Sequence, residues 1–156
     1  MRYVARLMAV VLLGVQAAGC ASTGGGGEGG RTLGPEVTGL TRGGVLTHVP
    51  GILSRYGYRV LRRQEQPQSL YFETDWESRT PFPDEAEQGF QVAETRIIVR
   101  ATYRMRRLDT RLYSVQFEGQ NRFKRTPDSG WEEIAATEMF KTHLETISRA
   151  LEPYVR

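Results

Sequence analysis

The stretch ETRIIVRATYRMRR (Glu94–Arg107) is followed closely by RLYSVQFEGQNRFK (Arg111–Lys124). Apolar and polar side chains alternate with a period of two in both, as in strands with one buried face. Residues 108–110 are a tight turn, so we predict two long antiparallel strands. Their inward side chains are Thr95, Ile97, Val99, Ala101, Tyr103, Met105, Tyr113, Val115, Phe117 and Phe123. Their outward side chains are Arg96, Arg100, Thr102, Arg104, Gln116, Glu118, Gln120 and Arg122.

Two shorter strands are predicted upstream, at 58–63 and 69–79, joined by a turn over 64–68. In the second strand, Trp76 shares the face of Leu70 and Phe72 and is predicted to lie in the core. The alternative is an exposed aromatic used in recognition. Residues 80–91 contain two prolines and several acidic residues, which favour a long loop.

A helix is predicted on each side of the four strands. The first begins near Thr41 and ends at Gly57, with Pro50 producing a kink or a restart. The last is capped by Asp128 or Ser129. The first apolar stripe comprises Val45, Leu46, Val49, Ile52, Leu53 and Tyr56. The last comprises Trp131, Ile134, Phe140, Leu144, Ile147, Leu151 and Tyr154.

This order predicts an α+β fold, a two-layer sandwich with one domain over residues 36–156. A four-stranded antiparallel sheet carries the N-terminal helix and the long C-terminal helix on one face, and its other face meets water.

The N-terminus has the pattern of a secretory signal. A basic segment, 1–6, precedes an apolar segment, 7–15, that is too short to span a bilayer. The next residues end in Ala17-Ala18-Gly19-Cys20, which resembles the lipobox of bacterial lipoproteins. That resemblance implies a signal peptide over 1–19, cleavage between Gly19 and Cys20, and a covalent lipid on Cys20. The alternative is a cleaved signal followed by a free thiol.

Residues 20–35 are predicted to be the lipidated cysteine followed by a glycine-rich flexible tether. Without the two signal arginines, 21 − 2 = 19 basic residues face 18 acidic ones, a balance that argues against nucleic-acid binding. A single cysteine excludes an internal disulfide. No hydrolase elbow or zinc-binding histidine pair is present, so we expect no enzyme activity, no metal and no cofactor.

A family resemblance is carried by two segments. Gly57-Tyr58-Arg59-Val60 ends the first helix, and Phe72-Glu73-Thr74-Asp75-Trp76-Glu77 comes next in a strand. Over about residues 40–110 the chain resembles the BamC-like outer-membrane lipoproteins, which are lipid-anchored and have helix-grip domains. The resemblance implies one such domain here, acting as an accessory factor beside the outer-membrane assembly machinery.

A candidate binding face consists of five arginines of the two long strands, Arg96, Arg100, Arg104, Arg107 and Arg111. They could meet an acidic partner or anionic lipid. The alternative is a solvated face on which they pair with Glu73, Asp75 and Glu77, carboxylates that could otherwise serve acid–base chemistry or bind calcium.

We therefore expect a lipoprotein of the cell envelope whose soluble domain binds other envelope proteins. Ala21 stands where aspartate retains lipoproteins in the inner membrane, which favours the outer membrane, facing the periplasm. The alternative is a lipid or ligand carrier with a pocket between the last helix and the sheet. A large cavity there would favour the carrier, and a filled core the assembly or scaffold module.

Overall fold

The computed structural model describes residues 30–107 and 110–155, which form a seven-stranded antiparallel sheet and three helices. The strands are β1 (Arg31–Leu33), β2 (Val37–Thr41), β3 (Val60–Glu65), β4 (Ser69–Thr74), β5 (Glu77–Arg79), β6 (Val92–Arg107) and β7 (Thr110–Lys124). The helices are α1 (Arg42–Arg55), α2 (Pro83–Ala86) and α3 (Glu138–Arg149), followed by a 3₁₀ turn at Glu152–Tyr154.

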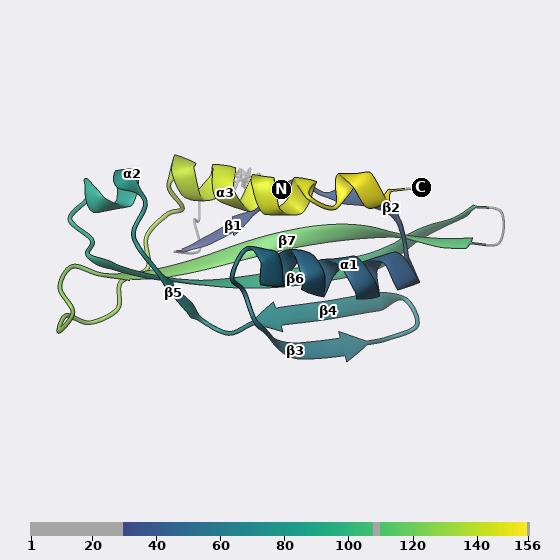
Figure 1. Ribbon diagram of the computed structural model, residues 1–156, viewed down its shortest axis with the longest axis horizontal. Coiled ribbons are helices and arrows are strands. Elements are labelled where there is room, and N and C mark those ends of the chain that lie inside the picture. The colour runs from purple at the N-terminus through teal and green to yellow at the C-terminus, as the bar shows by residue number, and fades with distance from the viewer. Residues whose placement is uncertain (1–29, 108–109, 156) are drawn as a thin grey trace, which may run out of the picture.

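The β6–β7 hairpin is the centre of the sheet, whose order is β1-β7-β6-β4-β3 (Figure 1). Strands β1 and β2 both pair with β7, at successive positions along it. Strands β4 and β5 likewise both pair with β6. Both long helices pack on the same face, which we call the inner face. The opposite face is called the outer face.

The alternation along β6 and β7 is confirmed. Val99 is opposite Phe117 and Ala101 opposite Val115, and all four side chains are completely buried. The helices cover these residues with Val45, Val49, Ile52 and Leu53 of α1 and Leu144 and Ile147 of α3, together with Leu151. Complete burial of such side chains stabilises the fold by about 1.5–3 kcal/mol each.

Helix α3 approaches β7 closely because one inward position is glycine. A Cβ atom on Gly119 would lie 2.5 Å from Cζ of Phe140, which is completely buried. The absence of a side chain at Gly119 therefore makes room for the first turn of α3.

The chain is α+β as predicted, but the predicted four-stranded sheet with two helices is wrong. Strands β1 and β2 were not predicted, and β1 lies in the segment assigned to the tether. Residues 31–41 are interrupted by Gly34, Pro35 and Gly39 and show no strand pattern. They are strands because the long edge of β7 supplies their backbone partners.

The predicted strand 69–79 is divided into β4 and β5. At the break, Thr74 Oγ1 accepts a hydrogen bond from the backbone N–H of Ile97 at 2.9 Å, and Asp75 accepts from the N–H of Trp76. The side chain of Trp76 then lies against Arg96 and Arg122, which face outward, so its predicted place in the core is wrong.

Two further boundaries differ from the prediction. The 80–91 segment contains α2, which starts with Pro83 at its first turn. Helix α3 is capped by Thr137 rather than by Asp128 or Ser129, because Glu132 forms a backbone bridge with Phe123 and keeps that segment extended. In contrast, α1 begins where predicted, just after Thr41, which caps it, and Gly57 comes after that helix with a positive φ of 86°.

Within the described residues, no helix has the length and apolar character needed to cross a membrane.

Candidate functional site

The outer face brings together the first two of the five predicted arginines. Arg96 donates to Glu73 at 2.9 Å and to the Gln120 side chain at 2.6 Å. Arg100 forms an ion pair with Glu118, and Gln120 donates to the same carboxylate at 2.6 Å. This part of the face is therefore a network of hydrogen-bonded ion pairs in which Arg100 meets solvent while Glu118 and Gln120 are buried.

The remaining arginines do not complete one surface. Arg104 donates to Glu36 at 3.0 Å, across the β2 edge of the sheet. Arg111 donates to the Pro67 carbonyl at 3.4 Å, which also accepts from Tyr113 on the inner face. A register shift between Tyr103 and Met105 interrupts the alternation before the hairpin ends. The side chain of Arg107 lies outside the described part of the chain.

The predicted cleavage and lipidation residues, Gly19 and Cys20, also lie outside the described residues.

The three carboxylates of the β4–β5 segment do not converge. Glu73 pairs with Arg96, whereas Asp75 pairs with Arg59 at 3.0 Å. Glu77 accepts a long hydrogen bond from the backbone N–H of Arg59. Among the described residues, no group of three or more potential metal ligands is present.

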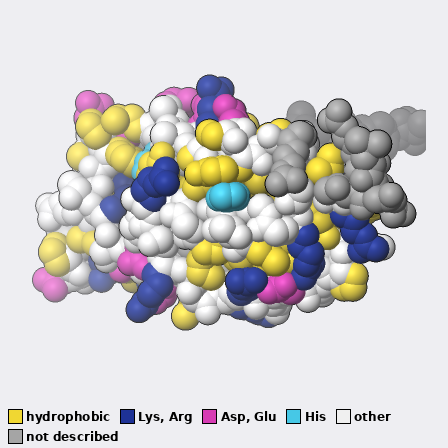
Figure 2. Space-filling view, turned by 45° about the vertical axis from the view of Figure 1, so that its right-hand side comes forward, with side chains coloured by type: hydrophobic (Ala, Val, Ile, Leu, Met, Phe, Trp, Pro, Cys, Tyr) yellow, Lys and Arg dark blue, Asp and Glu magenta, His cyan; other side chains and the backbone are white. Residues whose placement is uncertain are grey.

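Burial alone would raise the pKa of Glu118, but hydrogen bonds from Arg100 and Gln120 outweigh it and hold that pKa below its usual value. Hydrogen bonds from Ser114 and Arg104 likewise lower the pKa of Glu36. Both groups are therefore ionised at neutral pH. In the view of Figure 2, basic side chains are dispersed over the surface and in several places lie beside acidic ones.

At one end of the outer face, cationic groups alternate with two indole rings. The guanidinium of Arg122 lies 4.4 Å from the ring centroids of both Trp76 and Trp131. Arg96 lies 4.9 Å from the first ring and Lys124 lies 4.8 Å from the second. We call this set the tryptophan–cation ladder. Each such contact contributes about 0.5–1 kcal/mol at exposed sites.

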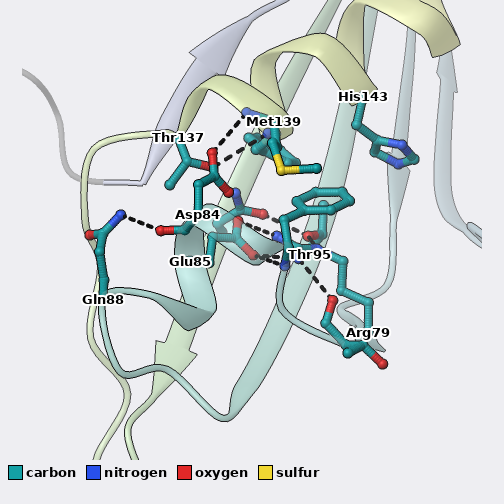
Figure 3. Close-up of polar contacts among 12 residues, drawn as sticks. Arg79, Asp84, Glu85, Gln88, Thr95, Thr137, Met139 and His143 are labelled. Atoms are coloured by element: carbon teal, nitrogen blue, oxygen red, sulfur yellow. Dashed lines mark hydrogen bonds and ion pairs between the residues drawn. The ribbon is translucent and has the colours of Figure 1, made fainter.

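A second polar cluster, called the end cluster, joins β5 and α2 to the inner face (Figure 3). Arg79 donates two hydrogen bonds to the carboxylate of Glu85, at 2.6 and 2.7 Å, and a third to Thr95 at 2.8 Å. The Glu85 side chain is completely buried and also accepts from the N–H of Phe82. Thr95 donates in turn to Asn121 at 2.6 Å.

The end cluster also holds the start of α3. Asp84 accepts from the backbone N–H of Met139 at 2.9 Å, beside the Thr137 cap (Figure 3). This carboxylate therefore satisfies one donor of the first helical turn and favours its dipole.

His143 of α3 lies beside the end cluster, and its Nε2 atom is 3.2 Å from the Tyr58 hydroxyl. Burial, with the positive charge of Arg79 adding to it, lowers the pKa of His143. Burial raises the pKa of Tyr58 to about 12. His143 is therefore neutral at pH 7. The other histidine, His48, stacks on Tyr154 with ring centroids 3.7 Å apart, beside a surface hollow of about 340 Å³.

Neither Arg79 nor Glu85 was identified as a site residue from sequence patterns. Pro83 followed by two acidic residues is the pattern of a helix start, and it could have indicated α2. The pairing itself depends on the turn that returns α2 towards β5, which no local pattern encodes.

The space between α3 and the sheet is filled by side chains. Leu144, Ile147, Val115 and Phe117 each have no exposed surface, and they belong to one continuous core. The contacts of α3 with the sheet are therefore those of a packed interior.

Comparison of the chain with protein-family models and with curated proteins finds no match in either.

Proposed function

We propose that this protein is a lipid-anchored lipoprotein of the bacterial cell envelope whose folded domain is a non-enzymatic docking module for other envelope proteins. The proposal places the anchor on Cys20 and the domain on the periplasmic side of the outer membrane. It includes a relation to the BamC-like lipoproteins, for which the support is the pair of segments around Tyr58 and Trp76.

The observation that carries the docking role is the outer face. Within the described residues, the two long helices cover the inner face, so the long β6–β7 hairpin presents ion pairs such as Arg100–Glu118 and Arg104–Glu36 on the opposite side. Charged groups on such a face give an encounter surface with orientation and specificity. The filled interior beneath α3 supports docking over the alternative of a carrier.

The anchor is tested by replacing the only cysteine. Cys20→Ser removes the acylation site, and we expect the protein to leave the membrane fraction. Mass spectrometry of the protein that retains Cys20 should show the mass of acyl chains on that residue. A variant that still sediments with membranes after a high-salt wash would contradict the anchor.

The docking role is tested by charge reversal on two matched arginines. Arg104 and Arg149 are about equally exposed, at 58% and 61%, and each forms one ion pair with a glutamate. Cross-linking in intact cells should lose envelope-protein partners in Arg104→Glu and keep them in Arg149→Glu. Equal cross-linking in both variants would overturn the docking role of the outer face.

A further inference from the structure

We propose that the domain binds an anionic lipid surface through one edge of the outer face. The contact comprises Leu33, Trp131, Arg122 and Lys124, and we call it the tether-side patch. The proposal rests on the lipid anchor at Cys20 and adds what the anchor alone does not specify, namely the orientation of the domain.

The patch lies where the chain arrives from Cys20. The carbonyl of Gly30 accepts from the backbone N–H of Asn121 at 2.8 Å. At Gly30 φ is 76°, and a Cβ atom there would lie 2.5 Å from the Asn121 carbonyl oxygen and 3.4 Å from Cβ of Glu133. The chain therefore meets the domain in a tight space between β7 and the segment that contains Trp131.

Pairing along β7 places the patch residues around that point. Leu33 is opposite Glu118 and therefore faces outward. Farther along β7, Glu132 forms a backbone bridge with Phe123, which brings its neighbour Trp131 against Arg122 and Lys124. The patch thus lies on both sides of Gly30, on the same edge of the sheet.

The length of chain between the anchor and the domain limits their separation. About ten residues separate Cys20 from Gly30, so even a fully extended chain spans at most about 35 Å. An anchored domain cannot move farther than that from the lipid surface at this point. The patch is consequently held at a high effective concentration relative to the headgroups.

The chemistry of the patch matches that surface. Leu33 is 65% exposed and Trp131 is 39% exposed, so two large apolar side chains lie at the surface near the basic ones. Indole rings favour the boundary between headgroups and acyl chains. Lys124 is positioned to meet lipid phosphates, since basic side chains near an anionic surface are attracted to it. Arg122 is paired with Glu94 and supports the ring of Trp131.

The two tryptophans allow a direct test. Trp76→Phe leaves Trp131 as the only tryptophan in the chain. The lipid-modified protein is reconstituted in vesicles of phosphatidylethanolamine and phosphatidylglycerol, with and without brominated acyl chains. We expect a blue-shifted Trp131 emission that the brominated lipids quench. Equal emission in both kinds of vesicle would overturn the proposal.

Matched variants identify the contact. Leu33 on β1 and Leu61 on β3 are equally exposed, at 65%, on opposite edges of the sheet. In the Trp76→Phe background, Leu33→Ser should reduce the quenching and Leu61→Ser should not. Lys124→Gln should lower the ratio of lipid-bound to unbound domain about fivefold, and only in anionic vesicles. Equal quenching in the two leucine variants would contradict the assigned edge.

The outcomes separate this inference from the proposed function. Mass spectrometry of the same sample reports whether Cys20 carries lipid. If Cys20 carries lipid but Trp131 is not quenched, the proposed anchor is supported and the proposed contact of the patch with lipid is wrong. Without lipid on Cys20, both fail. Quenching that appears only when a copurified protein is added would assign the patch to a protein partner and overturn the lipid contact.

Discussion

The end cluster and the outer face contain the same kind of ion pair in opposite surroundings. In the end cluster, Glu85 is completely buried and the side chain of Arg79 is only 16% exposed. On the outer face, the side chains of Arg104 and Glu36 are 58% and 42% exposed. Arg79 makes three hydrogen bonds to side chains, whereas Arg104 makes one to Glu36.

The difference in burial means that losing one partner of an ion pair should affect stability differently in the two regions. A buried pair must offset the loss of hydration, so it tolerates no missing partner. An exposed pair gains little because water competes for both charges. The end cluster is therefore expected to hold the structure together, whereas an exposed pair such as Arg104–Glu36 can be rearranged when a partner binds.

The largest effect is expected from Glu85→Gln. The change leaves the guanidinium of Arg79 near the interior without its carboxylate, which should cost about 3–5 kcal/mol of unfolding free energy. Urea denaturation of the variant measures the loss. Glu87→Gln, in the exposed residue just after α2, is the control and should be nearly neutral. A loss below about 1 kcal/mol in Glu85→Gln would remove the distinction between the two regions.

A smaller effect is expected from the pH dependence of His143. Its pKa is lowered in the fold from 6.5, so the unfolded state binds more protons as the pH falls below 6.5. Stability should therefore be highest above pH 6.5 and decrease as the pH falls towards the folded pKa. The groups around the ring include Tyr56, Tyr58, Phe82, Arg79 and Glu85.

Thermal melting of the protein and of His143→Gln over this pH range measures that dependence. The variant should lose the decrease below pH 6.5 while keeping the loss of stability below pH 4.5, where Glu118 and Glu36 become protonated. Identical profiles for the two proteins would mean that His143 does not titrate differently on folding.

The smallest effect is expected from Arg104→Gln. Its ion pair with Glu36 is exposed, so we expect a loss of only about 0.2–1 kcal/mol in unfolding free energy. Urea denaturation of this variant is compared with that of Arg149→Gln, which replaces a similarly exposed arginine on α3. A loss as large as that of Glu85→Gln would show that the outer face is structural and not a rearrangeable surface.

The β6–β7 hairpin, with one apolar and one polar face, could be predicted from residue order alone. Alternation places Val99 and Phe117 on one face and Arg100 and Gln116 on the other, because side chains along a strand project alternately. The local signals at Thr41 and Gly57 likewise located the two ends of α1, since caps depend on neighbouring backbone groups. The outward arginines of β6 were therefore identifiable without a structure.

The rest of the sheet and the end cluster depend on tertiary contacts. Arg31–Leu33 has no strand pattern of its own and pairs because β7 presents a free edge. Arg79 and Glu85 meet through a turn, and Trp76 moves to the outer face because the strand breaks at Asp75. The physical reason is common to all three. An unpaired strand edge, a buried charge and a large aromatic ring each interact with groups that are close only in the folded chain. Residue order alone does not identify those groups.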